Sequence, residues 1–151
     1  MFHPLKSLAA AAGLGLLGLH SAARADVVLD WNAYLREVMK RDSATSNPGW
    51  STRSLAMMNG AIFDAFQAIS RTHHPLRVDT AAPPGTSRHA AAAQAAYRIA
   101  TALYPDHAVW LSWAGGYSLN LVPNGEGKSA GIALGNAIAD AYLGWRMDDG
   151  A

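Results

Sequence analysis

The sequence predicts an all-α protein, a helical bundle of about five helices. Apolar residues recur at three- and four-residue steps along most of the chain beyond residue 25, which is the period of an amphipathic helix. No segment alternates between apolar and polar residues as a half-buried strand does. The chain of 151 residues is 50% hydrophobic and 15% charged, and it has no cysteine. This composition indicates one globular domain and excludes a disulfide scaffold, a cysteine-based metal site and a disordered charged tail.

Residues 1–25 predict a signal peptide that precedes the fold. A positively charged start is followed by an uncharged run rich in Ala, Leu and Gly over residues 7–19, and Ala23-Arg24-Ala25 has the form of a cleavage site. The alternative is a membrane anchor, but this run is well short of the roughly 20 residues that a spanning helix needs. We therefore expect cleavage after Ala25, a mature chain over residues 26–151 with no membrane attachment, and a periplasmic or secreted location.

The charge of the chain argues against nucleic-acid binding. The formal net charge is +1, and removal of Lys6 and Arg24 with the signal peptide makes it slightly negative. The remaining basic residues are spread singly, so no stripe of positive charge is present to neutralise phosphates.

The first two predicted helices span residues 27–41 and about 51–70. The apolar face of the first carries Val28, Trp31, Leu35, Val38 and Met39. A small, polar segment with Pro48 separates it from the second helix, whose apolar face carries Leu55, Met58, Ile62, Phe66 and Ile69.

Three further helices are predicted after a proline-containing linker over residues 72–87. An alanine-rich helix spans residues 89–103 and ends before Pro105. We expect Asp106 to cap a fourth helix that runs to about residue 121, with a kink at Gly115-Gly116, because glycine weakens a helix interior. A turn at residues 123–125 leads to a fifth helix over residues 127–147.

Small residues recur every fourth position along the fifth predicted helix. They are Gly127, Gly131, Gly135 and Ala139. In a membrane this pattern would indicate a dimerisation face. Because charged and polar residues interrupt the apolar run, we interpret it as close packing between helices of a soluble bundle.

The candidate chemistry of the chain is sparse. Ligand-type side chains gather in one part of the sequence: Asp64, His73, His74, Asp79 and His89. They match no established metal-binding spacing, and a solvated loop is the favoured interpretation over a divalent metal site. The carboxylates Asp148 and Asp149 follow a helix end, where the helix dipole disfavours negative charge, and we interpret them as solvated. No nucleotide-binding, esterase or zinc-protease motif is present.

The order of five segments resembles the amino-terminal helices of bacterial vanadium-dependent haloperoxidase-like proteins, of the phosphatidic-acid-phosphatase-type superfamily. The segments cover essentially all of residues 26–151: DVVLDWN at 26–32, RSLAMMNGAIFDAFQAI at 53–69, AAAAQAAYR at 90–98 with LYP at 103–105, GIALG at 131–135, and WRMDDG at 145–150. The resemblance implies an all-helical enzyme that binds vanadate, or phosphate in its phosphatase relatives, and that uses peroxide to oxidise halides.

The oxyanion site of that family is absent from this chain. The family builds it from a Lys and an Arg followed by Pro, a Pro-Ser-Gly-His segment and Ser-Arg-x5-His. This sequence has no Arg-Pro and no Pro-Ser-Gly-His, and its two Ser-Arg pairs are followed at the required distance by Arg77 and Gln94 instead of His. Ser87-Arg88-His89 is a near match only. We therefore assign no catalytic, cofactor-binding or metal-binding residue in this chain.

Two classes of function remain. In the first, the chain is an incomplete part of a larger helical domain, a non-catalytic scaffold whose partner is the carboxy-terminal remainder and whose cofactor, vanadate, is expected only for the full-length family member. In the second, it is a stand-alone secreted helical module that binds a partner, with a homo-oligomer as one form. The first predicts apolar side chains without partners, and Trp110, Trp113 and Trp145 are the candidates.

Overall fold

The structure is a computed structural model that describes residues 26–43 and 47–147. Within these ranges it is all-helical, without strands, as predicted. The elements, in chain order, are α1 (Val27–Arg41), α2 (Pro48–Ser70), α3 (Arg88–Leu103), a short 3-10 turn η1 (Pro105–His107), α4 (Ala108–Asn120) and α5 (Glu126–Trp145). The predicted signal peptide and the pair Asp148 and Asp149 lie outside the described residues. Over the described part, no helix combines the length and apolar character needed to cross a membrane.

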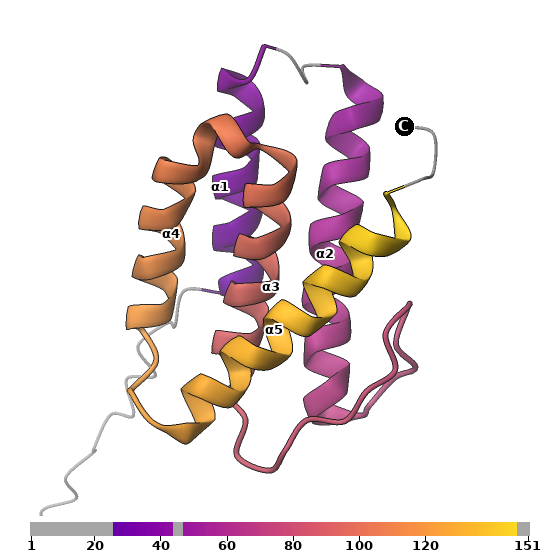
Figure 1. The fold of residues 1–151 in the computed structure, drawn as a ribbon, viewed down its shortest axis with the longest axis vertical. Helices are drawn as coiled ribbons and strands as arrows, with labels where there is room; N and C mark the ends of the chain where they lie inside the picture. Colours follow the sequence, from indigo (N-terminus) through magenta and orange to yellow (C-terminus); the bar gives the residue numbers. More distant parts are fainter. Residues whose placement is uncertain (1–25, 44–46, 148–151) are drawn as a thin grey trace, which may run out of the picture.

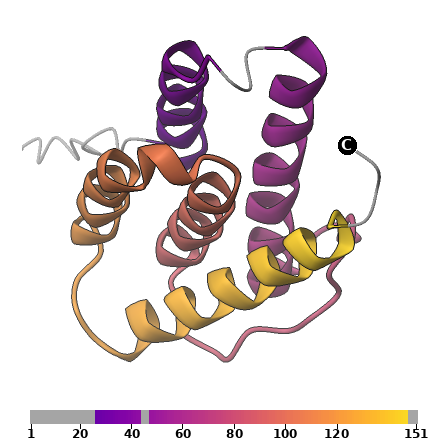
Figure 2. The same ribbon diagram turned by 45° about the horizontal axis from the view of Figure 1, so that its top comes forward.

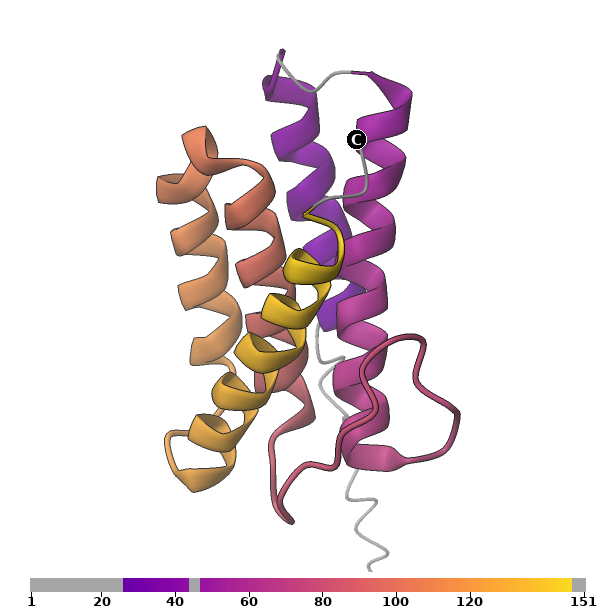
Figure 3. The same ribbon diagram turned by 45° about the vertical axis from the view of Figure 1, so that its right-hand side comes forward.

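The helices form a bundle in which α3 is central. Four helices, α1 to α4, run alongside one another, and α5 crosses α3 and α2 obliquely on one side (Figure 1). The same crossing is visible from above in Figure 2. The segment between α2 and α3 loops out beside the carboxyl end of α2 (Figure 3).

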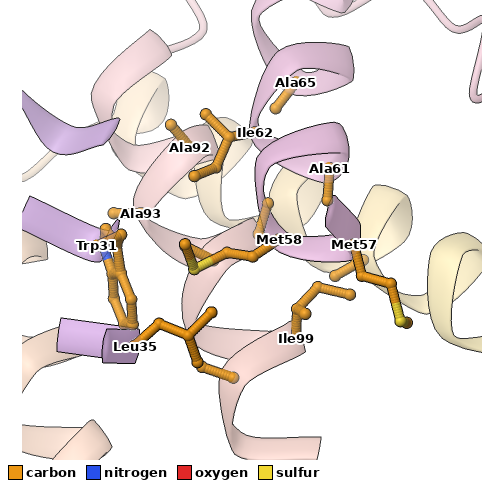
Figure 4. Close-up of a cluster of buried hydrophobic side chains, with 14 of the residues drawn as sticks. Trp31, Leu35, Met57, Met58, Ala61, Ile62, Ala65, Ala92, Ala93 and Ile99 are labelled. Atoms are coloured by element: carbon orange, nitrogen blue, oxygen red, sulfur yellow. The ribbon is translucent and has the colours of Figure 1, made fainter. Parts of the chain in front are cut away.

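The core is formed where α1, α2 and α3 meet. Trp31 and Leu35 of α1 face Met58 of α2 and Ile99 of α3, and all four side chains are almost completely buried (Figure 4). Alanines of α3 fill the positions between them, so the central helix presents small side chains to its neighbours. The large side chains of the outer helices therefore pack closely around α3, and a single core extends through the bundle.

The small-residue face of α5 packs against the start of α3, and this confirms the interpretation as close packing within the bundle. A side-chain carbon added to Gly131 would lie 2.7 Å from the carbonyl oxygen of Ser87, and one added to Gly135 would lie 2.5 Å from that of Ala91. Only glycine fits these contacts. The side chains of Gln94 and Asn136 form a hydrogen bond of 2.8 Å across the same interface.

Helix boundaries differ from the sequence prediction mainly at the starts of α2 and α4, and α5 ends at Trp145 instead of residue 147. Helix α2 begins at Pro48 instead of residue 51, because the Asn47 side chain accepts the backbone N–H of Trp50 and proline suits the first helical turn. Asp106 does not cap α4; it lies within η1, and His107 occupies the cap position without a side-chain hydrogen bond.

Helix α4 contains the two glycines at which a kink was predicted. The helix is continuous through Gly115 and Gly116. At Gly115 a side-chain carbon would lie 2.9 Å from the ring of Tyr97. This glycine therefore admits the tyrosine ring of α3, and the packing offsets its low helix propensity.

Candidate functional site

The loop between α2 and α3 is held by one buried carboxylate. Asp64 of α2 is fully buried and accepts the backbone N–H groups of Leu76, Arg77 and Val78 at 2.6, 2.9 and 2.8 Å. The hydroxyl of Tyr142 on α5 donates a further hydrogen bond to Asp64 at 2.9 Å. A buried carboxylate with this many donors is well satisfied, so Asp64 joins the loop, α2 and α5 into one unit.

Tyr142 stays a neutral hydrogen-bond donor in this arrangement. Burial raises the pKa of its hydroxyl well above the ordinary tyrosine value, and the hydrogen bond to Asp64 raises the pKa further. The nearby Arg77 guanidinium acts in the opposite direction. Tyr142 therefore stays protonated throughout the physiological pH range and keeps its hydrogen bond to Asp64.

The five candidate metal ligands do not converge. Asp64 is bound by the loop, and Asp79 forms an ion pair with Arg71 at 3.1 Å. His73 and His74 are exposed beside a shallow hollow, and the ring of His89 contacts the carbonyl oxygen of Ser118 at 3.1 Å. Across the described ranges, no group of three His, Cys, Asp or Glu side chains is arranged to hold a metal ion.

The three residues of the near match to the oxyanion motif, Ser87-Arg88-His89, have three different structural roles. Ser87 caps α3 by accepting the N–H of Ala90 at 3.2 Å, and the Arg88 guanidinium lies 4.7 Å from the ring centre of Phe66. His89 contacts α4 through Ser118. Because these side chains point to different neighbours, they do not form an oxyanion cradle.

A cavity of about 250 Å³ lies between α2, α5 and the loop, next to the Asp64 anchor. Its apolar floor is made by Met57, Gly60, Leu76, Tyr142 and Trp145. The absence of a side chain at residue 60 makes room for the Tyr142 ring, because an added carbon would lie 2.9 Å from that ring.

Three arginines line the same cavity. Arg53 donates from Nη2 to the backbone oxygen of Arg146 at 2.8 Å, close to the carboxyl end of α5. Arg77 and Arg146 lie over the ring of Trp145, with guanidinium carbons 4.7 and 5.3 Å from its centre. The cluster could not be predicted from the sequence, because its members come from distant segments and no spacing signal connects them.

A second surface feature is the outer side of α4. Four large apolar residues follow one another at four-residue steps and are mostly exposed: Val109 (77%), Trp113 (77%), Tyr117 (58%) and Leu121 (42%). We call this set the α4 stripe. Helix α4 itself carries no charged side chain. A contiguous exposed apolar surface of this kind is uncommon on a monomer.

The three tryptophans expected to lack partners differ from one another. Trp113 is exposed as predicted. Trp110 packs against Tyr34, with ring centres 5.8 Å apart. Trp145 contacts Tyr142 edge to face, lies under two arginines and stays about half exposed. The apolar surface that lacks packing partners is therefore smaller than the sequence indicated, and it lies mainly on α4.

No family model, curated protein or solved structure matches this chain.

Proposed function

We propose that the chain is a non-catalytic, amino-terminal helical scaffold of an exported enzyme of the vanadium-dependent haloperoxidase or acid-phosphatase-like type. The observation that carries this proposal is the α4 stripe. Its four residues form one uncharged apolar row on an otherwise well-packed bundle. Such a row is stabilised when further helices cover it, so the remainder of the enzyme would pack there.

The ordered sequence blocks support the same proposal through their roles in the fold. The block at 53–69 lies in α2 and contains the buried Asp64, and the block at 131–135 contains the glycines that admit α3. These residues position the helices, which is what a scaffold requires.

The chemistry of vanadate is expected from the remainder of the enzyme and not from this chain. A multiply charged oxyanion needs several converging donors, and the covalent bond to it in this family needs a histidine. Among the described residues that line the arginine cavity, none is a histidine. Vanadate would therefore be bound by residues of the covering segment.

The coding sequence downstream of Ala151 tests this proposal. We expect it to encode Arg-Pro, Pro-Ser-Gly-His and Ser-Arg-x5-His, either in frame or after a frameshift. Unrelated sequence after a stop codon would contradict the scaffold function. Export is tested separately by mass spectrometry of the secreted or periplasmic protein, which should begin at Asp26; an intact Met1 in the membrane fraction would contradict export.

A second candidate, a stand-alone secreted binding module, is favoured by the arginine-lined cavity. The two functions differ in how the chain behaves alone. A scaffold with an uncovered stripe should bind the dye ANS and associate with itself, whereas a self-sufficient module should melt cooperatively without binding the dye.

A further inference from the structure

The cavity between α2, α5 and the loop has room for a small flat ligand. Its volume is about 250 Å³. For comparison, an apolar cavity of about 150 Å³ in another protein binds benzene. One aromatic ring could therefore lie against Met57 and Tyr142, and space would remain for a substituent.

Arg77 is placed to contact an anionic substituent. Its guanidinium lies 4.7 Å from the centre of the Trp145 ring, and its backbone N–H is held by Asp64 at 2.9 Å. The N–H donors of the Arg77 guanidinium suit a carboxylate, which arginine recognises through two parallel hydrogen bonds.

The positive charge of Arg77 at the cavity also favours an anion. Arg53, Arg77 and Arg146 line it, and no Asp or Glu is among the described lining residues. The carboxylate of Asp64, which contacts the lining residue Tyr142, is occupied by the loop N–H groups and the Tyr142 hydroxyl. Arg53 is already engaged at the carboxyl end of α5, so Arg77 is the principal contact.

We propose that this cavity binds a small carboxylate with a flat apolar body, in which the ring contacts Met57 and Tyr142 and the carboxylate pairs with the guanidinium of Arg77. This site is independent of the scaffold function and of the vanadate chemistry, because it uses neither the α4 stripe nor any histidine.

Phenylacetate is the probe that tests the proposal, with calorimetry on the purified full chain. We expect a Kd of about 1 mM or tighter, typical of a ligand of this size. Acetate supplies the charge without the ring, and benzyl alcohol supplies the ring without the charge. Each should bind at least about tenfold more weakly, since each loses one of the two contacts.

Two variants test the two contacts separately. Arg77→Gln removes the cation and should raise the Kd for phenylacetate about tenfold without changing the Kd for benzyl alcohol. Ala56→Trp places a large side chain at the exposed mouth of the cavity and should abolish binding of both. The matched controls are Arg36→Gln and Ala33→Trp, which make the same changes at exposed positions of α1 and should leave the Kd within about twofold.

The variant Asp148→Asn/Asp149→Asn addresses competition from the carboxylates that follow Met147 in the sequence. Binding of phenylacetate by the unaltered chain or by this variant, with sensitivity both to Arg77→Gln and to Ala56→Trp, supports the site. Absence of binding by both forms overturns it. Binding that Ala56→Trp leaves unchanged, or equal affinities for phenylacetate and benzyl alcohol, overturns it as well.

Discussion

Helices α4 and α5 both contain glycines but differ in how they are packed. Helix α4 has two glycines and α5 has four. In α5, Gly131 and Gly135 face α3, and the backbones approach within contact distance. In α4 the inner side, with Leu111 and Ala114, is buried, while the large side chains of the α4 stripe point outward. Apolar composition therefore does not decide burial, whereas the side-chain size on the facing surface decides how closely two helices pack.

The largest effect is expected where α5 touches α3. In Gly135→Ala the new carbon would lie 2.5 Å from the oxygen of Ala91 and 2.8 Å from the nitrogen of Ala95, and both are backbone atoms that cannot rotate away. We expect the free energy of unfolding to fall by about 3 kcal/mol in urea denaturation.

The control for this comparison is Gly116→Ala in α4, where nothing lies within 4 Å of the added carbon. This change should stabilise the protein by up to about 1 kcal/mol, because alanine is the better helix former. Equal effects of the two substitutions would show that α4 and α5 are packed alike.

The next largest effect is expected at the buried anchor. Asp64→Asn keeps the shape of the side chain but replaces one acceptor oxygen with an N–H₂ group that would face backbone donors. We expect a loss of about 2 kcal/mol in the free energy of unfolding. Asp140→Asn, which affects an exposed pair with Arg98, should change it by less than about 0.5 kcal/mol. A similar result for both would mean that Asp64 does not hold the loop.

A smaller effect with a distinct pH dependence is expected at Tyr142. Its folded-state pKa lies above the ordinary value of 10.0, so the unfolded chain loses this proton first as pH rises. The stabilisation is fully present below about pH 10 and is lost above it. Tyr142→Phe should cost about 1 kcal/mol at neutral pH and should reduce the alkaline slope of the unfolding free energy. The same slope in both proteins would exclude this role, and Tyr117→Phe on the α4 stripe serves as the control.

The smallest effect on stability is expected on the α4 stripe. Trp113→Gln together with Tyr117→Gln should change the free energy of unfolding by less than about 0.5 kcal/mol, because both side chains are largely exposed. The same variant should bind less ANS and should remain monomeric at concentrations where the unaltered chain associates. Unchanged dye binding and association would show that the stripe is not the exposed apolar surface.

Much of the secondary structure could be predicted from local patterns. The α1 bounds and the carboxyl ends of α2 and α3 follow from apolar periodicity and from residues such as Pro105. The start of α2 was missed although Asn47-Pro48 is a recognised helix-start signal, because a small, polar segment with proline was interpreted as a loop.

The candidate site could not be predicted in the same way. Arg53, Arg77 and Arg146 lie on α2, the loop and the end of α5, and only the crossing of α5 over α2 brings them to one cavity. Asp64 was grouped with nearby histidines because they are close in sequence. Its actual partners are backbone N–H groups and Tyr142, which carry no sequence signal.

The sequence by itself determined the all-α class, most of the helix positions and the small-residue face of α5, because helical periodicity, capping and glycine spacing act between residues three or four positions apart. The tertiary structure alone decided that this face packs against α3 and that Gly115 of the continuous α4 contacts the Tyr97 ring. It also decided that the α4 stripe remains exposed and that three distant arginines line one cavity. These outcomes depend on contacts between segments far apart in the chain, and such contacts are set by the shapes of the packed surfaces rather than by any local pattern.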